Sequence, residues 1–466
     1  MQSLLCCAAV LALHACGGGD GGADDAKASA QAAAIEDDSA VDAVIVTGAA
    51  SADEPEQLST AHEGISVKDD GGAYAAEIAA SSLPAPPPSV GAPEQSVPAQ
   101  GDMAIEKAAQ AAYDALADTQ YQLYVASDGS DRNPGTKDLP FMSITKASRA
   151  AKPSTTIYVA PGTYRENVLT RPRTNAAGRV SFVSSTPGAA KIIGSGTGAA
   201  WTNRGNYVDI VGFDISGTGR IGIANLGSQT TISGNHVHDI KVSGGCTSAG
   251  GAGIVNADYA GSDADIIGNL VHDIGTPGSC NGVQGIYHSN KRGRIQNNVV
   301  YRASSFGIHL WHAATDVVIS NNTTFQNGSK RMGGGIVIGA GDKPGKIVVN
   351  NTHVSNNIVV QNPRFGITQY CYRGQNCIGE TNTVTNNLIY GNGVNLVMKV
   401  GKASGTIMAD PQFVRYAPDS AAGNYGLKST SPAIDRGMRA HAPLQDIVGI
   451  KRPRGGGVDL GAHESY

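Results

Sequence analysis

A short phrase recurs six times between residues 230 and 392, and it limits the fold of this chain more than any other feature. Each copy has an aliphatic residue, a spacer and an asparagine, followed by a short apolar segment. Recurrence at about 20 to 50 residues is typical of repeat proteins, in which each repeat packs on its neighbours. The repeated residues are Asn235, Asn269, Asn298, Asn322, Asn357 and Asn387, at steps of 34, 29, 24, 35 and 30 residues.

A second motif recurs once per repeat, in register with the asparagines. Gly-Ile pairs begin at 222, 253, 285, 307, 335 and 366, and Val-Asn-Leu at 394–396 is a looser seventh member. Each repeat alternates apolar and polar positions between Gly, Asn, Asp or Ser, which is typical of short strands and tight turns. No helical period of suitable length occurs inside the repeats. We therefore predict stacked coils of parallel strands, about 4.8 Å apart, with hydrogen-bonded asparagines along the axis.

The first 118 residues differ in composition from the repeats. Residues 17–118 are rich in Ala, Gly, Asp and Glu and include a Pro-rich run at 84–88. Such a segment cannot bury a core, so we predict a disordered tether followed by a β domain at 119–466. The 61 glycines and two tryptophans of the whole chain fit a turn-rich β protein with a disordered portion.

Residues 1–16 are similar to a bacterial lipoprotein signal peptide. Residues 2–15 are apolar, too few to span a membrane as a helix, and Cys16 is followed by three glycines. The similarity implies that Cys16 carries a lipid after cleavage, and the alternative is an ordinary secretory signal or a misplaced start codon. We expect a protein of the cell envelope, held to the membrane only by this lipid as an outer-membrane lipoprotein, or a secreted protein.

Charge is distributed unevenly along the chain. Residues 17–118 hold 19 of the 39 acidic and 3 of the 35 basic residues, which leaves 20 acidic and 32 basic residues for 119–466. The near-neutral whole therefore combines an acidic tether with a basic domain of net charge +12. A positive surface favours polyanions. Export favours an acidic polysaccharide over nucleic acid as the partner, and we expect a monomer.

Four cysteines lie in the β domain. Cys246 and Cys280 are 34 residues apart, the same step as Asn235 to Asn269, which places them over one another in neighbouring coils. Cys371 and Cys377 close one loop. An exported protein permits both disulfides. A metal site is the weaker interpretation, because the sequence has no Cys-X-X-Cys pair.

The two ends of the β domain carry a family resemblance. The segments 121–131, 133–136, 140–151 and 156–168 predict a strand, a loop, one short amphipathic helix that caps the stack, and the first coil strand. They resemble the start of extracellular right-handed parallel β-helix proteins of the pectate lyase-like superfamily, and 409–414, 431–437 and 457–464 resemble its closing segment. The resemblance implies an all-β, right-handed parallel β-helix. It indicates activity less specifically, because the superfamily includes lyases, epimerases, hydrolases and adhesins.

Strand alternation then identifies a candidate site. If each Ile of the Gly-Ile pairs points inward, the next residue points outward. The first outward column is Ala224, Val255, Tyr287, His309, Val337, Thr368 and Val397. The second column is Leu226, Ala257, Ser289, Trp311, Gly339, Tyr370 and Lys399. Among these small or aliphatic residues, Tyr287, His309 and Trp311 stand out on adjacent coils.

An aromatic and cationic patch suits an acidic sugar chain, because aromatic rings stack on pyranose faces and Arg or Lys holds carboxylates. A lyase also needs a base for the proton next to the carboxylate and an acid for the leaving oxygen. We predict Tyr287, His309 and Arg331 as catalytic residues, with His309 or Tyr287 as base or acid. Arg331, Arg292 or Lys330 would neutralise the carboxylate. The predicted substrate-binding residues are Trp311, His312, Lys291, Arg292, Lys330, Tyr370 and Lys399.

Other polar residues receive structural interpretations. His288 lies in an inward column and is expected to be a hydrogen-bonded interior histidine. The pairs His238-Asp239 and His272-Asp273 recur one coil apart, so stacking explains them better than a catalytic dyad. Ca²⁺ is the only cofactor that the sequence indicates, with Asp258, Asp263 and Asp265 in one loop as oxygen ligands. Solvated loop carboxylates are the alternative.

Two function classes remain. The first is a polysaccharide lyase that cleaves a uronate-containing polymer by β-elimination. A glycosidase would need two apposed carboxylates, which the outward columns lack. The second is a non-catalytic surface protein that binds glycan along the same face, or that only projects this face from the envelope.

Overall fold

A computed structural model describes residues 120–246, 250–340, 348–371, 376–419 and 423–465 of the chain. The predicted signal peptide at 1–16 with Cys16, and the tether at 17–118, lie outside these residues. The described part contains one α-helix, α3 (Ile144–Ala150), and 31 β-strands. It contains no helix with the length and apolar character that a membrane crossing requires.

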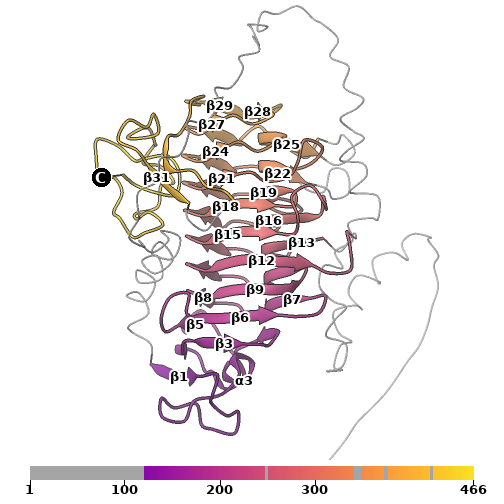
Figure 1. Cartoon of the computed structure of the whole chain (residues 1–466), viewed down its shortest axis with the longest axis vertical. Coiled ribbons are helices and arrows are strands. Elements are labelled where there is room, and N and C mark those ends of the chain that lie inside the picture. Colours follow the sequence, from indigo (N-terminus) through magenta and orange to yellow (C-terminus); the bar gives the residue numbers. More distant parts are fainter. Residues whose placement is uncertain (1–119, 247–249, 341–347, 372–375, 420–422, 466) are drawn as a thin grey trace, which may run out of the picture. The chain divides into compact units, whose positions relative to one another are not determined.

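Three parallel sheets form the walls of a right-handed β-helix, which confirms the predicted fold (Figure 1). Sheet A consists of β1 (Tyr121–Val125), β2 (Thr155–Val159), β5 (Val180–Ser184), β8 (Val208–Val211), β11 (Thr231–Ser233), β14 (Asp265–Ile267), β17 (Arg294–Gln296), β20 (Val318–Ser320), β23 (His353–Ser355), β26 (Thr383–Thr385) and β29 (Lys402–Ser404). Sheet B consists of β3 (Gly162–Tyr164), β6 (Ala190–Gly194), β9 (Asp214–Gly219), β12 (His236–Val242), β15 (Leu270–Ile274), β18 (Val299–Ala303), β21 (Thr323–Phe325), β24 (Ile358–Val360) and β27 (Leu388–Tyr390). Sheet C consists of β4 (Val168–Thr170), β7 (Ala199–Asn203), β10 (Ile221–Asn225), β13 (Gly251–Asn256), β16 (Val283–His288), β19 (Phe306–Leu310), β22 (Gly334–Ala340), β25 (Phe365–Cys371) and β28 (Val394–Val397).

The repeated asparagines form a ladder at the turn from sheet A to sheet B. The Nδ2 of each one donates to the Oδ1 of the next, at 2.9 to 3.0 Å, from Asn235 through to Asn387. The residue before each ladder asparagine has φ between 52° and 66°, a conformation that Gly and Asn tolerate best. The repeated Gly-Asn and Asn-Asn pairs therefore encode this turn and the stacking of the coils.

The Gly-Ile column is explained by packing inside the coil. The isoleucines, including Ile286 and Ile308, point into the core and are fully buried. A Cβ on Gly285 would lie 2.4 Å from Cγ1 of Val300 in sheet B and 2.6 Å from the carbonyl oxygen of Gly307 in the next coil. Sheets B and C approach too closely here for any larger residue.

The helix α3 packs at the N-terminal end of the stack, as predicted. Ser143 caps its first turn by accepting a hydrogen bond from the Lys146 amide. Ile144 and Ala147 are fully buried, and the helix contacts β1, β2 and β4. The exposed apolar end of the first coil is therefore covered by these side chains.

The C-terminal segment after β29 lies beside the stack rather than over its end (Figure 1). Its antiparallel strands β30 (Phe413–Arg415) and β31 (Asn424–Leu427) cover part of the outer face of sheet B. Ring centroids of Phe325 and Tyr425 lie 4.6 Å apart, and Asn356 donates to the carbonyl of Met438 at 2.8 Å. The outer face of sheet B is therefore partly apolar and covered in its C-terminal half.

Both predicted disulfides are present. Cys246 bonds to Cys280, with Cα atoms 5.2 Å apart, and Cys371 bonds to Cys377. The first bond joins neighbouring coils, which confirms that residues one repeat apart lie over each other.

Candidate functional site

The outer face of sheet C has the arrangement that alternation predicted. Tyr287 of β16 pairs with His309 of β19, and His309 pairs with Val337 of β22. Val337 in turn pairs with Thr368, and Gly339 with Tyr370, both on β25. Residues 22 to 31 positions apart in the sequence thus become neighbours on one wall.

Six side chains on and beside this wall form a continuous group of rings, which we call the aromatic group. Tyr287 lies edge-on to His309, with ring centroids 5.2 Å apart, and His309 lies 5.1 Å from Trp311. Trp311 stacks on Tyr370 at 5.6 Å, with 11° between the ring planes. The remaining members are Tyr259 and His312, whose ring centroids are 4.0 Å apart.

Burial corrects two of the predicted sugar contacts. Trp311 is only 3% exposed and His312 only 5% exposed, so neither offers a free face to a ligand. A Cβ on Gly339 would lie 2.8 Å from the Trp311 ring, which shows that the indole packs against the glycine of the next coil. Tyr287 and Tyr370 are partly exposed, as are Tyr259 and His309, so a sugar can reach these rings.

His309 has an unusual environment for a predicted catalytic base. Its Nδ1 is buried and has no hydrogen-bond partner among the residues that the structure describes. Burial, and then the nearby His312, lower the pKa of His309 to about 3. The imidazole is therefore neutral at ordinary pH and a weak base in the free protein.

The predicted cations lie at two opposite edges of sheet C. Lys330 and Arg331 precede β22, at the edge where the sheet C strands begin, whereas Lys291 and Arg292 follow β16, at the edge where the strands end. All four side chains are exposed, as is Lys399 after β28. Strand alternation alone predicts these basic residues in a single patch. The turns instead separate Arg331 from Arg292 by the width of the sheet.

Arg292 belongs to a separate cavity at the edge between sheets C and A. Its guanidinium pairs with Asp263 at 2.6 Å, and Asp265 pairs in the same way with Arg294 of the next coil. The open cavity has a volume of ≈ 540 Å³. Its charged lining residues are Arg179, Asp263, Asp265, Arg292, Arg294 and Asp316.

These ion pairs correct the calcium hypothesis. The carboxylates of Asp263 and Asp265 face arginines, and Asp258 accepts from the Ala260 amide in its own turn. Within the described ranges, the three do not converge on a common point as the ligands of a cation would. We therefore do not retain this loop as a Ca²⁺ site.

His288 is an interior histidine, as predicted. It is fully buried, its Nδ1 lies 3.0 Å from the Asn256 side-chain amide, and its Nε2 lies 3.1 Å from the Arg292 carbonyl. It continues a second ladder, in which Asn203, Asn225 and Asn256 are joined by hydrogen bonds of 2.8 and 2.9 Å. This residue stabilises the coil and is not available to a ligand.

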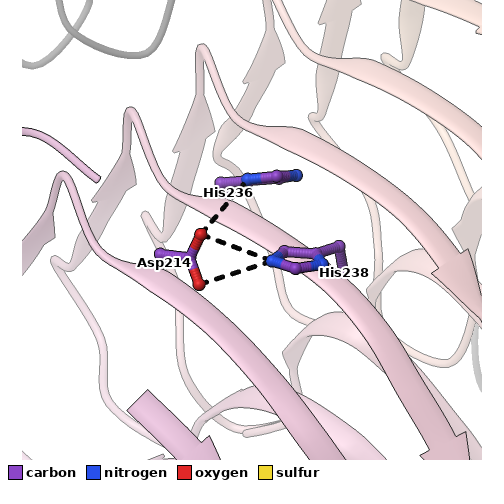
Figure 2. Close-up of side chains that lie close together, drawn as sticks. All are labelled: Asp214, His236 and His238. Carbon is purple, nitrogen blue, oxygen red and sulfur yellow. Dashed lines mark hydrogen bonds and ion pairs between the residues drawn. The ribbon is translucent and has the colours of Figure 1, made fainter. Parts of the chain in front are cut away.

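The sequence interpretation missed a second polar group, on the outer face of sheet B. Asp214 of β9 lies beside His236 and His238 of β12 (Figure 2). Burial lowers the pKa of His236 to about 4 despite its bond to Asp214. The repeated His-Asp pairs were explained by stacking alone, and the partner Asp214 carries no motif that would have indicated it.

Comparisons with known proteins agree with the fold. Residues 123–404 match a family model described as Pel9A-like, right handed beta helix region. The chain is similar to the crystal structure of pectate lyase Pel9A, at 18% identity and a TM-score of 0.52, over 75% of this chain and 97% of that one. A structure named rhamnogalacturonan lyase is similar at 15% identity and a TM-score of 0.45, over 67% of this chain and 96% of that one.

One curated sequence also matches. The uncharacterized protein YwoF of Bacillus subtilis (strain 168) is 46% identical over 46 residues. The chain spans about a tenth of the length of this relative, since the match covers 10% of it.

Proposed function

Because the chain belongs to the family with a Pel9A-like, right-handed β-helix region, we propose that it binds and cleaves an acidic polysaccharide on the outer face of sheet C. The observation that carries this proposal is the aromatic group at the middle of that face, with basic residues at both edges of the sheet. Tyr287 and Tyr370 offer partly exposed rings for sugar stacking. Lys330 and Arg331 at one edge, and Lys291 at the other, attract carboxylates of a chain that crosses the strands.

The reaction that suits these residues is β-elimination. A cation holds the uronate carboxylate, which makes the proton on the adjacent carbon more acidic, a base removes that proton, and an acid protonates the departing glycosidic oxygen. The low pKa of His309 makes it a poor base in the free protein, so we assign both proton transfers to Tyr287. Its phenolate takes the proton from the carbon, and the phenol so formed gives that proton to the departing glycosidic oxygen. His309 packs edge-on against Tyr287 and positions it.

A glycosidase mechanism has less support. It requires two carboxylates on either side of the scissile bond. In the described part of sheet C, the outward columns contain no Asp or Glu.

The second candidate function is glycan binding without cleavage. The burial of Trp311 and the weak basicity of His309 favour it, because both reduce the chemistry available on the wall. The aromatic group would then serve only as a stacking surface.

A screen of the full-length chain against pectate, alginate and other acidic polysaccharides separates the two candidates. Cleavage by elimination produces an unsaturated uronate with new ultraviolet absorbance. We expect Tyr287→Phe to abolish this signal while retaining sedimentation with the polymer, and Tyr370→Ala to weaken both. Tyr390→Phe, on an exposed tyrosine of sheet B, is the matched control and leaves both unchanged. If the native protein sediments with a polymer but does not cleave it, the result would favour the second candidate.

We also propose that Cys16 anchors the protein to the envelope through a lipid. The support is the signal-like composition of residues 1–16. Cys16→Ser should move the protein from the membrane fraction to the soluble fraction, and an unchanged distribution would refute the anchor.

A further inference from the structure

Asp214, His236 and His238 converge on one point of sheet B (Figure 2). His236 Nδ1 lies 3.5 Å from Asp214 Oδ2, and His238 Nε2 lies 3.3 and 3.4 Å from the two carboxylate oxygens. Both histidines of β12 project from the outer face, because Val237 between them is fully buried. A register shift between Val237 and Ile240, with φ of 48° at Asp239, bends the strand at this position.

These separations are long for direct hydrogen bonds. Nitrogen and oxygen in a hydrogen bond prefer about 2.7 to 3.2 Å. Two ligands on a tetrahedral zinc ion, each about 2.05 Å from the metal, lie about 3.3 Å apart. The observed 3.3 to 3.5 Å between the carboxylate and each imidazole therefore matches the edge of a coordination sphere.

The surrounding hydrogen bonds fix the proton on the far side of the His238 ring. Its Nδ1 lies 2.8 Å from the carboxylate of Asp239, which can only accept. The Nδ1 therefore carries a proton, and in the neutral form of the ring the lone pair of Nε2 points toward Asp214. A carboxylate behind the ring is the usual partner of a metal-bound histidine.

A longer relay fixes the His236 ring in the same way. His272 Nδ1 lies 2.6 Å from Asp273, and Asp273 in turn pairs with Arg302 at 2.7 Å. The proton on His272 Nδ1 leaves its Nε2 as an acceptor, 2.8 Å from Nε2 of His236. His236 then donates from Nε2 and turns the lone pair of Nδ1 toward Asp214.

In these neutral tautomers two imidazole lone pairs and a carboxylate face one another, an arrangement that repels unless a proton or a metal ion lies between them. We propose that Asp214, His236 Nδ1 and His238 Nε2 bind one divalent transition-metal ion of the zinc type. Two nitrogen ligands favour such a metal over Ca²⁺, which takes six to eight oxygens. The side chains are 16 to 18% exposed, so water can reach a fourth position. The ion would join consecutive coils at β9 and β12, beside the face that the C-terminal segment covers.

Zinc titration of the full-length chain tests this site directly. The protein is first treated with a chelator, and its free thiols are alkylated so that Cys6, Cys7 and Cys16 cannot bind metal. Calorimetry should then show one Zn²⁺ per chain and no binding of Ca²⁺ at equal concentration. Asp214→Asn, which keeps the side-chain shape, and His238→Ala should each weaken binding at least tenfold. Asp239→Asn should weaken it by about 10 to 100-fold, because Asp239 only orients the His238 ring.

A matched control uses the other stacked histidine pair on the coil surface. His353 and His441 have ring centroids 4.5 Å apart, and His353 Nδ1 lies 2.9 Å from the hydroxyl of Thr383. His353→Gln should leave zinc affinity unchanged. Circular dichroism of each variant in chelator separates loss of the site from loss of the fold. Zinc binding that persists in folded Asp214→Asn and His238→Ala variants would overturn the proposal, as would a native chain that binds no zinc. If the native chain binds no zinc, His236, His238 and His272 instead share an extra proton.

Discussion

Removal of one member of the asparagine ladder tests how strongly the turns are held in register. Asn298 is fully buried near the middle of the ladder. Its Oδ1 accepts from the backbone amide and the Nδ2 of Asn269, at 2.9 and 3.0 Å. Its Nδ2 donates to the carbonyl of Ile266 at 2.9 Å and to Oδ1 of Asn322 at 3.0 Å.

Asn298→Ala removes all four bonds but does not affect every partner equally. The Asn322 Oδ1 still accepts from the Asn298 amide, and the Asn269 Nδ2 still donates to Ile232. The amide of Asn269 and the carbonyl of Ile266 lose their side-chain partner inside the coil. An unsatisfied buried group costs about 1 to 3 kcal/mol, and the carbonyl of Ile266 stays within the ladder of β14 and β17, so we expect a loss of about 1 to 3 kcal/mol in the free energy of unfolding.

Urea unfolding followed by circular dichroism measures this loss. Asn175→Ala is the control, because Asn175 is exposed and its Oδ1 accepts one bond, from Ala177 in the same turn. We expect the control to change stability by less than about 1 kcal/mol. A loss in Asn298→Ala no larger than that of the control would refute the claim that the ladder stabilises the stack.

Two further predictions concern pH and the disulfides. Burial holds the pKa of His309 at about 3 and that of His463 at about 4. Below about pH 6.5 the unfolded chain therefore binds more protons than the folded chain. The free energy of unfolding should fall as the pH drops from about 6.5 toward 3. His309→Phe should flatten this decline in urea midpoints, and an unchanged pH dependence would contradict the assignment. Replacing Cys246 and Cys280 by alanine should cost about 3.5 to 4 kcal/mol, against about 2 kcal/mol for Cys371 and Cys377, since the closed loops differ in length. Equal losses in the two paired variants would show that loop closure does not set the difference.

The fold could be predicted because its signals are periodic. The Asn-Asn column reflects the residue of positive φ in each turn from sheet A to sheet B. The Gly-Ile column reflects the close contact between sheets B and C. Both requirements recur from coil to coil. The same periodicity placed Tyr287 beside His309 and Cys246 beside Cys280, because a stack converts a repeat length into a contact. Strand alternation also identified His288 as an interior residue.

The composition of the sites was harder to predict because it depends on features that do not repeat. Trp311 lies in an outward column, yet the glycine at 339 lets its ring lie flat under Tyr370, and no pattern indicates this burial. The lengths of individual turns decide that Arg331 and Arg292 emerge at opposite edges of sheet C. Asp214 pairs with His236 and also contacts His238, beside a register shift in β12 that a strict two-residue period does not show.

The outer face of sheet C is the proposed polysaccharide surface, and the chain has only two tryptophans that can report on it. Trp311 belongs to the aromatic group, while Trp201 is fully buried against Phe182 and Phe213. Fluorescence titration of the full-length chain with pectate or alginate should give a saturable change in emission, lost in Trp311→Phe and absent with neutral dextran. An equal change in Trp311→Phe, or none at concentrations where the polymer is bound, would contradict the assignment.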